Sequence, residues 1–355
     1  MNTASANLSP QEGARRILVV RTDRLGDVVL STPVFSALRR RFPLGCLAVL
    51  LRPYTVELVE GHPDVDLILS DDRDGKHRSL KGLIRLIREI RRHGFDIAIL
   101  LHPTFRLALA CRLARIPVRI GTGYRGYSLL FNRRIYQHRK SSGRHELDLN
   151  FDLLQPLGIS QEMISFSLSV PASAMEKTRS MLAEMGLSAS DPFVVLHPGS
   201  GGSASDWPVH GFAALADMIQ EKSGCAVVVT GNKREMQLVD IMAAMVKNPI
   251  IRLDGRLQIK ELLALLKQAR LLVANSTGPL HMAVAMGTAV VGLYCPLPAC
   301  SPRRWGPYHQ PDAVILPPSP CNTTCDSRKN HNSPCMEAIR VEDVYHKVKE
   351  TLSGT

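Results

Sequence analysis

ILVVRTDRLGDVVLSTP, residues 17–33, joins an apolar run of strand length to a second apolar pattern through a short polar turn. The run at 17–20 consists of aliphatic residues that are typical of a buried strand. The turn then carries two arginines, two aspartates and a glycine before the apolar pattern resumes. Two interpretations fit this turn by itself. It is either a helix start with ordinary capping side chains, or an active-site loop in which Asp27 is a catalytic base.

Length and composition indicate a globular protein with more than one domain. The 355 residues are enough for two domains, each with its own core. The chain is 45% hydrophobic, and no apolar run approaches the ~18–20 residues that a membrane-spanning helix needs. Residues 1–14 are polar and lack the apolar segment of a signal peptide, so we expect a flexible N-terminus and a cytoplasmic location.

The positive charge of the chain is concentrated in its first half. The net charge is +12, and residues 1–170 hold 26 Lys and Arg against 16 Asp and Glu, whereas the remainder holds 18 against 16. A one-sided field of this kind attracts polyanions, which include nucleic acid, anionic lipid and phosphorylated substrates. Solubility is the alternative explanation, but it does not require the charge to lie in one half.

Apolar runs of strand length alternate with amphipathic runs of helix length in two series. Strands are predicted at 17–20, 46–51, 66–69 and 96–101, and then at 193–198, 226–231, 250–255, 270–276 and 289–296. Continuous Val/Ile/Leu strands separated by helices are typical of parallel sheets covered on both faces. The sequence therefore predicts an α/β protein with two doubly wound domains. Their expected limits are 15–175 and 176–338, followed by a C-terminal helix at 339–355.

Ligands of open parallel sheets bind beyond the carboxyl ends of the strands, so the loops that follow strands are the places to examine. One such loop is HPGSGGSASDWP, residues 197–208. Its glycines let the backbone approach a ligand closely, and its serines offer hydroxyl groups. The candidate anion-binding residues are Gly199, Ser200, Gly201 and Ser205. A flexible turn with a serine cap is the alternative interpretation.

A second loop, NSTGPLH at residues 275–281, begins a helix directly after a strand. Ser276 or Thr277 fits an N-cap, and the proline two positions later suits a first helical turn. The free N–H groups and the dipole of a helix start suit a diphosphate beside Gly278. His281 lies in the same turn and can reach that anion; alone, it would be read as an ordinary helix-surface histidine.

A third strand ends in TGNKRE, residues 230–235. Glu235 either accepts hydrogen bonds from ribose hydroxyls or is a helix-start carboxylate favoured by the dipole. The chain contains neither GxGxxG nor GxxxxGK[ST], so no sequence motif supports a dinucleotide site or a P-loop.

Four segments in this order and spacing resemble the heptosyltransferases of lipopolysaccharide core synthesis, glycosyltransferase family 9. They are RTDRLGDVVLSTP, HPGSGGSASDWP, NSTGPLHMAVAMGT and RRWGP, and the resemblance extends from about residue 16 to 350. It implies a GT-B fold, with two Rossmann-like domains facing each other across a cleft. It also implies inverting, metal-independent transfer of heptose from ADP-heptose, with no cofactor. The implied acceptor is a phosphorylated, lipid-linked core oligosaccharide at the inner face of the inner membrane of a Gram-negative bacterium.

The resemblance assigns roles to particular residues. The catalytic aspartate of the family falls on Asp27, and its diphosphate-binding Thr-Gly and His fall on Thr277, Gly278 and His281. The N-terminal domain of the family holds the acceptor and the C-terminal domain holds the nucleotide sugar. The acceptor contacts are therefore expected at Arg21, Arg24, Gly26 and Arg125, whereas Asp23 is expected to be an ion-pair partner.

Two positions depart from the family pattern. Ser205 stands where a lysine often neutralises phosphate, and Ser276 stands where an aspartate often precedes Thr-Gly. Both changes bear on donor identity and on how the leaving diphosphate is neutralised. Arg303 or Arg304 is expected to take over part of that task.

Three other segments have a structural and a functional interpretation. DDRD at 71–74 could hold a metal, but we interpret it as a solvated loop and helix cap. The basic helix at 78–93 packs an apolar stripe on its sheet, and its arginines suit an anionic membrane surface, which predicts peripheral attachment. Cys321, Cys325 and Cys335 could bind zinc with a nearby histidine, although the spacing is not a standard one and reduced structural cysteines fit better.

Two alternative functions remain open from the sequence. One is a GT-B transferase with another nucleotide-sugar donor or another core acceptor. The other is a non-catalytic polyanion-binding protein, which the basic half alone would allow. The glycine and Ser/Thr loops of the second half are not expected of such a protein, and no RNA- or DNA-binding motif is present, so we expect no nucleic-acid partner.

Overall fold

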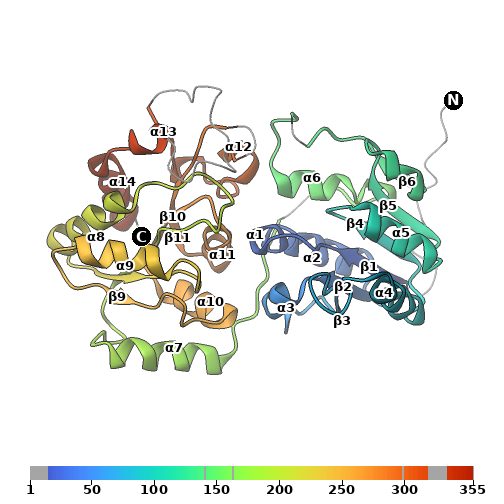
Figure 1. Cartoon of the computed structure of the whole chain (residues 1–355), viewed down its shortest axis with the longest axis horizontal. Coiled ribbons are helices and arrows are strands. Elements are labelled where there is room, and N and C mark those ends of the chain that lie inside the picture. The colour runs from blue at the N-terminus through green and yellow to red at the C-terminus, as the bar shows by residue number, and fades with distance from the viewer. Residues whose placement is uncertain (1–14, 140, 162–163, 298–299, 319–333, 355) are drawn as a thin grey trace. The chain divides into compact units, whose positions relative to one another are not determined.

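The computed structural model describes residues 15–139, 141–161, 164–297, 300–318 and 334–354. The chain divides into two compact units, Met1–Ser169 and Val170–Thr355. Each unit is built on one six-stranded sheet in which all paired strands are parallel (Figure 1). None of the described helices has the length and hydropathy of a transmembrane span.

The sheet of the first unit has the strand order β3-β2-β1-β4-β5-β6. Its strands are β1 (Arg16–Val20), β2 (Cys46–Leu51), β3 (Leu67–Ser70), β4 (Ile97–Leu100), β5 (Val118–Thr122) and β6 (Arg133–Ile135). The central strand β1 pairs with β2 on one side and with β4 on the other. The winding direction therefore reverses between β1 and β4, and this switch point is where doubly wound sheets bind ligands.

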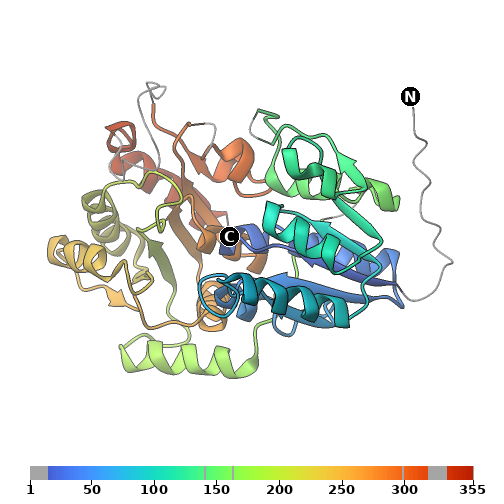
Figure 2. The same ribbon diagram turned by 45° about the vertical axis from the view of Figure 1, so that its right-hand side comes forward.

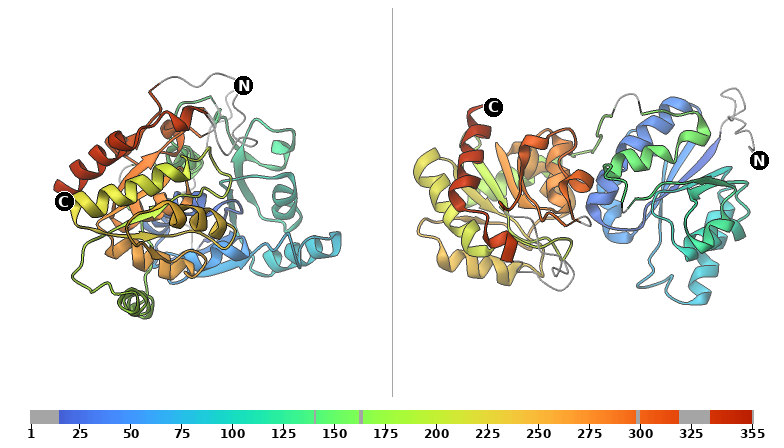
Figure 3. Two further views of the ribbon diagram at one scale, coloured as in Figure 1. Left: turned by 60° about the vertical axis from the view of Figure 1, so that its left-hand side comes forward. Right: turned by 90° about the horizontal axis from the view of Figure 1, so that it is seen from above.

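Helices cover both faces of this sheet (Figure 3). The helices of the first unit are α1 (Leu25–Val29), α2 (Thr32–Arg41), α3 (Pro53–Val59), α4 (Leu80–Arg92), α5 (Phe105–Leu113), η1 (Gly126–Leu130), α6 (Glu146–Asp152) and η2 (Gln155–Leu157). Leu86 and Ile90 of α4 and Leu107 of α5 pack with strand residues in one buried cluster. Ser79 caps α4 by accepting a hydrogen bond from the Gly82 N–H at 3.2 Å, which explains where this helix begins.

The second unit repeats the same winding. Its strand order is β12-β11-β10-β7-β8-β9, so β7 and β10 take the central places that β1 and β4 take in the first unit. The strands are β7 (Phe193–His197), β8 (Ala226–Val229), β9 (Ile251–Arg252), β10 (Leu271–Asn275), β11 (Ala289–Leu293) and β12 (Val314–Ile315). The second switch point therefore lies between the ends of β7 and β10.

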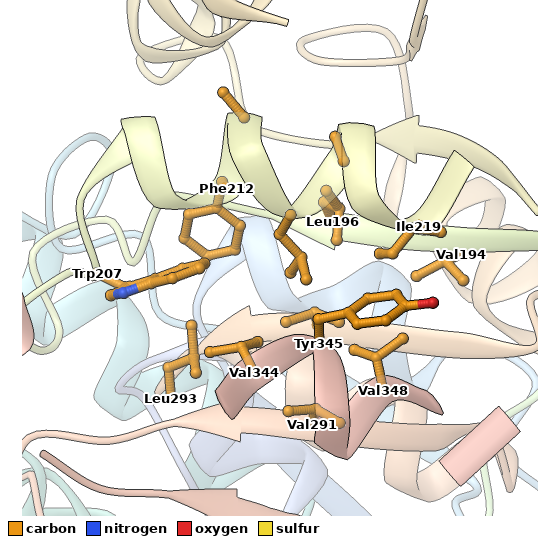
Figure 4. Packing of buried hydrophobic residues seen from close by; sticks show 14 of the residues in the cluster. Val194, Leu196, Trp207, Phe212, Ile219, Val291, Leu293, Val344, Tyr345 and Val348 are labelled. Carbon is orange, nitrogen blue, oxygen red and sulfur yellow. The ribbon is translucent and has the colours of Figure 1, made fainter. Parts of the chain in front are cut away.

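The helices of the second unit are α7 (Ala172–Glu184), α8 (Val209–Ser223), α9 (Met236–Met245), α10 (Ile259–Gln268), α11 (Gly278–Met286), α12 (Pro302–Trp305), η3 (Pro311–Ala313), α13 (Pro334–Glu337) and α14 (Val341–Ser353). Helices α8 and α14 bury their apolar sides against the sheet, as Phe212 and Val344 show (Figure 4). In the same cluster Trp207 Nε1 donates a hydrogen bond to the Ile339 carbonyl at 3.0 Å. Helix α7 packs on α10 at the other side, so it belongs to this unit (Figure 2).

The predicted fold class, two doubly wound α/β domains of GT-B type, is confirmed. Every strand predicted from an apolar run is present, and three strands of the described residues were missed: β5, β6 and β12. The sequences VRIGT of β5 and RRI of β6 contain arginines, and β12 has only two residues. Strands near a sheet edge expose part of their surface and do not need continuous apolar runs, which is why periodicity did not reveal them.

Candidate active site

Arg21 is the first residue after β1, and its guanidinium collects three carboxylates. Its Nε lies 2.8 Å from Oδ1 of Asp23, and its Nη2 lies 2.5 Å from Oδ1 of Asp27. Nη2 also lies 3.3 Å from Oε1 of Glu146, and Nη1 donates to Oδ1 of Asn150 at 3.1 Å. The arginine side chain is only 1% exposed. Arg21 therefore ties the turn between β1 and α1 to helix α6 from inside the first unit.

Burial and neighbouring charges have opposite effects on the pKa values of this cluster. Burial alone would lower the pKa of Arg21, but Asp23, Asp27 and Glu146 outweigh it and hold that pKa above its usual value. Burial raises the pKa of Asp23 to about 7, although the charge of Arg21 opposes the shift. His102, which follows β4, has its Nδ1 3.7 Å from Oδ2 of Asp23, and burial lowers its pKa. The loops after β1 and β4 thus meet at the switch point of the first sheet.

Asp27 lies in the first turn of α1, where the dipole of a helix favours a carboxylate. The N-cap residue of this helix, Arg24, makes no side-chain capping bond. Oδ1 of Asp27 is held by Arg21, and 12% of the aspartate side chain remains accessible to solvent. Asp27 therefore has the two properties that a general base needs: a fixed position and access to a substrate.

The sequence-predicted acceptor residues fall into two groups. Arg24 and Arg125 are exposed, as a contact to an anionic acceptor requires. Gly26 is buried within α1. Arg21 requires a correction, because its fully buried guanidinium is surrounded by carboxylates and has the place of an internal anchor, not of a phosphate ligand. The expectation that Asp23 pairs with a cation agrees with its contact to Arg21.

Sequence reasoning missed several partners of Arg21 in the first unit. Glu146 and Asn150 lie one turn apart on α6 and face Arg21 together. Arg139, which follows β6, contacts Glu146 Oε1 and completes the network. The spacing of Glu146 and Asn150 by four residues was the one available signal, since it places both on one side of a helix.

In the second unit, Glu235 holds the glycine loop in place. Its Oε1 accepts a hydrogen bond from the Gly201 N–H at 3.0 Å, and its Oε2 accepts one from the Asn232 N–H at 2.8 Å. A Cβ added to Gly199 would lie 2.3 Å from Oε1 of Glu235, so only glycine permits this approach. Nε2 of His197, at the end of β7, lies 3.8 Å from Oε2 of the same carboxylate. One carboxylate oxygen of Glu235 therefore holds the glycine loop, and the other holds the loop after β8 that carries Glu235 itself.

Two side chains join the loops that follow β7 and β10. Ser203 Oγ donates to the Ser276 carbonyl at 2.9 Å. Asn275 Nδ2 donates to the Pro198 carbonyl at 2.6 Å, and its Oδ1 accepts from the Trp207 N–H at 2.9 Å. Polar residues at the ends of buried strands were the signal for these contacts, and neither Ser203 nor Asn275 was among the predicted site residues.

The start of α11 lies beside these loops and has the features of an anion site. Thr277 occupies the N-cap position with extended backbone angles, but its hydroxyl makes no capping bond. Capping therefore does not use the side chain of Thr277. Gly278 begins the helix, and His281 is buried in its first turn. A helix start of this kind presents N–H groups and partial positive charge to an anion.

Three serines have different places in this unit. Ser276 is buried and is tied to Ser203 through its carbonyl. Ser200 is buried within the glycine loop, where its Oγ donates to the Ala204 carbonyl at 3.2 Å. Ser205, which was predicted to contact the donor anion, requires a correction, because it is fully buried and contacts Cys295. Its short side chain does not replace the lysine of the family pattern.

Tyr294 connects the end of β11 with the arginines of α12. Its hydroxyl donates to the Trp305 carbonyl at 2.7 Å. Burial raises the pKa of Tyr294, and a hydrogen bond with the side chain of Ser276 opposes that shift. The guanidinium of Arg304 lies over the Trp305 ring, 4.6 Å from its centre. Tyr294 therefore holds the turn of α12 against the loop that precedes α11.

Comparison with known proteins identifies the family to which this chain belongs. The model of glycosyltransferase family 9 (heptosyltransferase) matches residues 83–334. The chain belongs to glycosyltransferase family 9. It is therefore a glycosyl-transferring enzyme, and the alternative of a non-catalytic polyanion-binding protein is wrong.

Other members of the family resemble this chain along most of its length. Lipopolysaccharide heptosyltransferase 3 of Escherichia coli K12 is 26% identical over 276 residues, which are 76% of this chain and 79% of that protein. A family 9 glycosyltransferase of Veillonella parvula has a TM-score of 0.85 at 25% identity, covering 96% of this chain and 98% of that one. The ADP-heptose lipopolysaccharide heptosyltransferase II of E. coli has a TM-score of 0.76 at 22% identity, covering 96% and 99%.

The acidic run at 71–74 of this family 9 chain is a loop that is exposed at Arg73 and Asp74, as we expected, but not at its first residue. Asp71 is buried, and its Oδ2 lies 2.5 Å from Nη1 of Arg106. Asp72 accepts hydrogen bonds from the Gly75 and Lys76 N–H groups, both at 2.9 Å, and thereby closes a turn. The run does not cap α4 either, because Ser79 does so. Among the described residues no three His, Cys, Asp or Glu side chains converge as metal ligands.

Of the three cysteines that could bind zinc in this family 9 chain, only one lies within the described residues. Cys321 and Cys325 lie outside the described residues, whereas Cys335 is described and is half-buried beside the core of the second unit.

The basic helix predicted at 78–93 is present as α4, and its outer side is exposed at Lys81, Arg85 and Arg88.

Proposed function

We propose that this enzyme transfers heptose from ADP-heptose to a lipopolysaccharide inner-core acceptor, with inversion at the anomeric carbon. Membership of family 9 supports heptosyl transfer, and relatives that carry lipopolysaccharide heptosyltransferase names support the acceptor class. The observation that carries the mechanism is the contact between buried Arg21 and partly accessible Asp27 at the carboxyl end of β1.

Asp27 is the proposed general base. An inverting transfer needs one carboxylate that takes the proton of the acceptor hydroxyl while its oxygen bonds to the anomeric carbon. In the same step the bond from that carbon to the diphosphate oxygen breaks, and ADP leaves with the bonding electrons. Arg21 positions the base, because it holds Oδ1 of Asp27 while it is itself fixed by Glu146 and Asn150.

The second unit is proposed to hold the donor. The N–H groups at the start of α11, beside Thr277 and Gly278, suit the diphosphate, and the glycine loop held by Glu235 suits close backbone contact. The leaving diphosphate gains negative charge, so fixed donors and cations must stabilise it. Arg304 is the proposed cation, since Tyr294 and Trp305 hold its turn in place. His281, in the first turn of α11, adds a proposed contact.

Metal independence is part of the proposal and has a direct test. Turnover is expected to be unchanged after dialysis against a chelator, because backbone N–H groups and arginine supply the electrostatic stabilisation. A requirement for added divalent cation would contradict this part alone.

The acceptor is proposed to bind at the first unit from an anionic membrane surface on the cytoplasmic side. Exposed Arg24 and Arg125 lie in loops that follow β1 and β5, the edge that carries Asp27. The exposed cations of α4 flank two exposed apolar side chains, Leu80 and Ile84. Such a face suits anionic headgroups together with the boundary of the acyl region.

The proposal is tested by incubating the purified enzyme with ADP-heptose and a panel of truncated core acceptors, followed by mass measurement of the products. One acceptor is expected to gain a single heptose, and ADP is expected to raise the melting temperature. A parallel panel of other nucleotide sugars tests the alternative donor. If the enzyme transfers sugar from one of these donors and not from ADP-heptose, the proposed donor is wrong, whereas the proposed mechanism is unaffected.

A further inference from the structure

The exposed large aromatic side chains among the described residues gather at one edge of the first sheet. They are Tyr54, Phe105, Tyr124 and Tyr136. Each follows the end of a strand, β2, β4, β5 or β6, within five residues. Because the strands are parallel, these ends share the edge at which β1 presents Asp27. Exposed apolar groups are costly in water, and their concentration at a ligand-binding edge indicates a binding surface.

Three of the rings at this edge contact one another. The centres of Tyr124 and His138 are 4.0 Å apart, with the rings inclined at 32°. Tyr136 meets Tyr124 nearly perpendicularly, with 5.3 Å between ring centres. Tyr136 also lies directly over Gly123, where an added Cβ would be 2.5 Å from its ring. The arrangement is packed, yet Tyr136 is 63% exposed.

Hydrogen bonds fix the loop that carries this cluster. The Gly123 N–H donates to the Ile135 carbonyl at 2.8 Å, which holds the ends of β5 and β6 together. Buried Ser128 accepts from the Arg125 N–H at 3.0 Å and donates to the Thr122 carbonyl at 2.5 Å. Arg125 is therefore exposed on a loop that is held by its own hydrogen bonds, and a loop fixed in this way lowers the entropic cost of binding.

The same segment reaches the catalytic network. Arg139 follows Tyr136 by three residues and contacts Glu146, which in turn contacts Arg21. On the other side, the Tyr54 hydroxyl donates to the Asp23 carbonyl at 2.7 Å. Aromatic side chains therefore lie on both sides of the strand that precedes Asp27, within one connected set of contacts.

We propose that Tyr124, Tyr136 and His138 form a platform on which a sugar ring of the acceptor packs, next to the acceptor contact already proposed for Arg125. This inference rests on the proposed function and adds an acceptor subsite to it. A pyranose ring has apolar C–H groups on its faces and hydroxyls around its rim. The face of such a sugar can cover the exposed aromatic side chains, while its hydroxyls reach polar groups nearby. Tyrosine and histidine offer both an aromatic face and a polar group.

The experiment uses four single variants of the full-length enzyme. Tyr136→Ala removes the ring, and Tyr136→Phe retains it. Gly123→Ala displaces the ring of Tyr136 without deleting it, because the new Cβ occupies its place. Gly126→Ala is the matched control, since a Cβ at Gly126 meets nothing within 4 Å. Tyr136 is exposed, so its substitution is expected to leave the fold intact, and the melting temperatures of all four variants verify this.

The KM for the acceptor is expected to rise about tenfold in Tyr136→Ala and Gly123→Ala, which corresponds to the loss of one aromatic packing interaction. Tyr136→Phe and Gly126→Ala are expected to stay near the wild type. The KM for ADP-heptose and the thermal shift with ADP are expected to be unchanged in all four. An unchanged acceptor KM in Tyr136→Ala overturns the platform while the proposed function stands.

A second measurement separates the platform from the chemistry. Binding of the free, lipid-less core oligosaccharide is followed by calorimetry in the absence of donor. Weaker binding by Tyr136→Ala supports the platform even if no transfer product forms, in which case the proposed function alone fails. Equal binding by wild type and Tyr136→Ala, or a loss confined to phosphatidylglycerol vesicles, overturns the sugar platform, and the latter result assigns the rings to lipid.

Discussion

Nη2 of Arg21 lies 2.5 Å from Oδ1 of Asp27, and the same guanidinium contacts Glu146 from a helix that begins more than 100 residues later. The arginine is buried at the base of the turn, and the aspartate lies partly accessible in the first turn of α1. The orientation of the proposed base therefore depends on a distant helix and not only on its own turn.

Replacing Asp27 by Asn is expected to lower turnover by about 10²–10⁴-fold, the usual contribution of general acid–base catalysis. The amide cannot accept the proton of the acceptor hydroxyl. Binding of ADP is expected to be retained, because the proposed donor contacts lie in the second unit. Steady-state kinetics and calorimetry with ADP provide the measurements. Turnover close to that of the wild type would remove Asp27 from its proposed role.

Replacing Arg21 by Met is expected to lower the free energy of unfolding by about 3–5 kcal/mol, because it leaves buried carboxylates without their cation. Arg24→Met is the matched control at the exposed neighbouring arginine, and a change within about 0.5 kcal/mol is expected there. Urea unfolding of the two variants gives the comparison. Equal effects would show that Arg21 does not anchor the cluster.

Asp23 is expected to make stability depend on pH between about 4 and about 7. Burial raises its pKa to about 7 in the folded protein, whereas an unfolded chain has a value of about 4. The folded state therefore binds the proton more tightly, and stability falls as pH rises through this window.

Asp23→Asn removes the titration, so its stability relative to the wild type is expected to increase from pH of about 4 to about 7 and then to level off. Taking the difference cancels the groups common to both proteins, including Asp27, Glu146 and His102, which face Asp23. Urea unfolding across this range gives the measurement. A difference that does not vary with pH would contradict the assignment.

Glu235→Gln is expected to weaken ADP binding about tenfold, the loss expected for one hydrogen bond to a charged group. The amide of glutamine has one acceptor oxygen, whereas Glu235 uses two to hold Gly201 and Asn232. Glu221→Gln, on the surface of α8, is the control. The loss is expected to be equal for ADP and 2′-deoxy-ADP. A smaller loss for the deoxynucleotide would instead assign Glu235 to the ribose.

Reversing two charges of α4, Arg85→Glu with Arg88→Glu, is expected to weaken binding to phosphatidylglycerol vesicles at least about tenfold, since each surface cation contributes about 1 kcal/mol. The control pair Arg112→Glu with Arg115→Glu changes the net charge equally at exposed positions of the same unit. Vesicle sedimentation measures both. Equal losses would indicate a general charge effect with no role for the α4 face.

Much of the fold could be predicted from local patterns. Residues 17–20 and 193–196 are apolar throughout because the strands they form are covered on both faces, and such runs are visible without any knowledge of contacts. The loops after these strands could then be assigned to the ligand-binding edges. The short strand RRI of β6 could not be found, because its arginines carry no apolar periodicity.

The candidate site was predictable only in part. The Gly-Asp pair drew attention to Asp27, and the Ser-Thr-Gly segment drew attention to the start of α11. The sequence also suggested a phosphate partner for Arg21, whereas the structure surrounds it with carboxylates. Ser205 was expected to contact the donor anion, but it is fully buried.

The sequence by itself determined the alternation of strands and helices, and with it the sheet edges at which polar loops gather. Both depend on the spacing of apolar residues along the chain. Only the tertiary structure decided which charge each buried side chain meets. Arg21 faces Glu146 across 125 positions, and Tyr136 lies over Gly123 through the pairing of two strands. Packing and the cost of burying an unpaired charge determine these partners, and neither can be derived from the local sequence pattern.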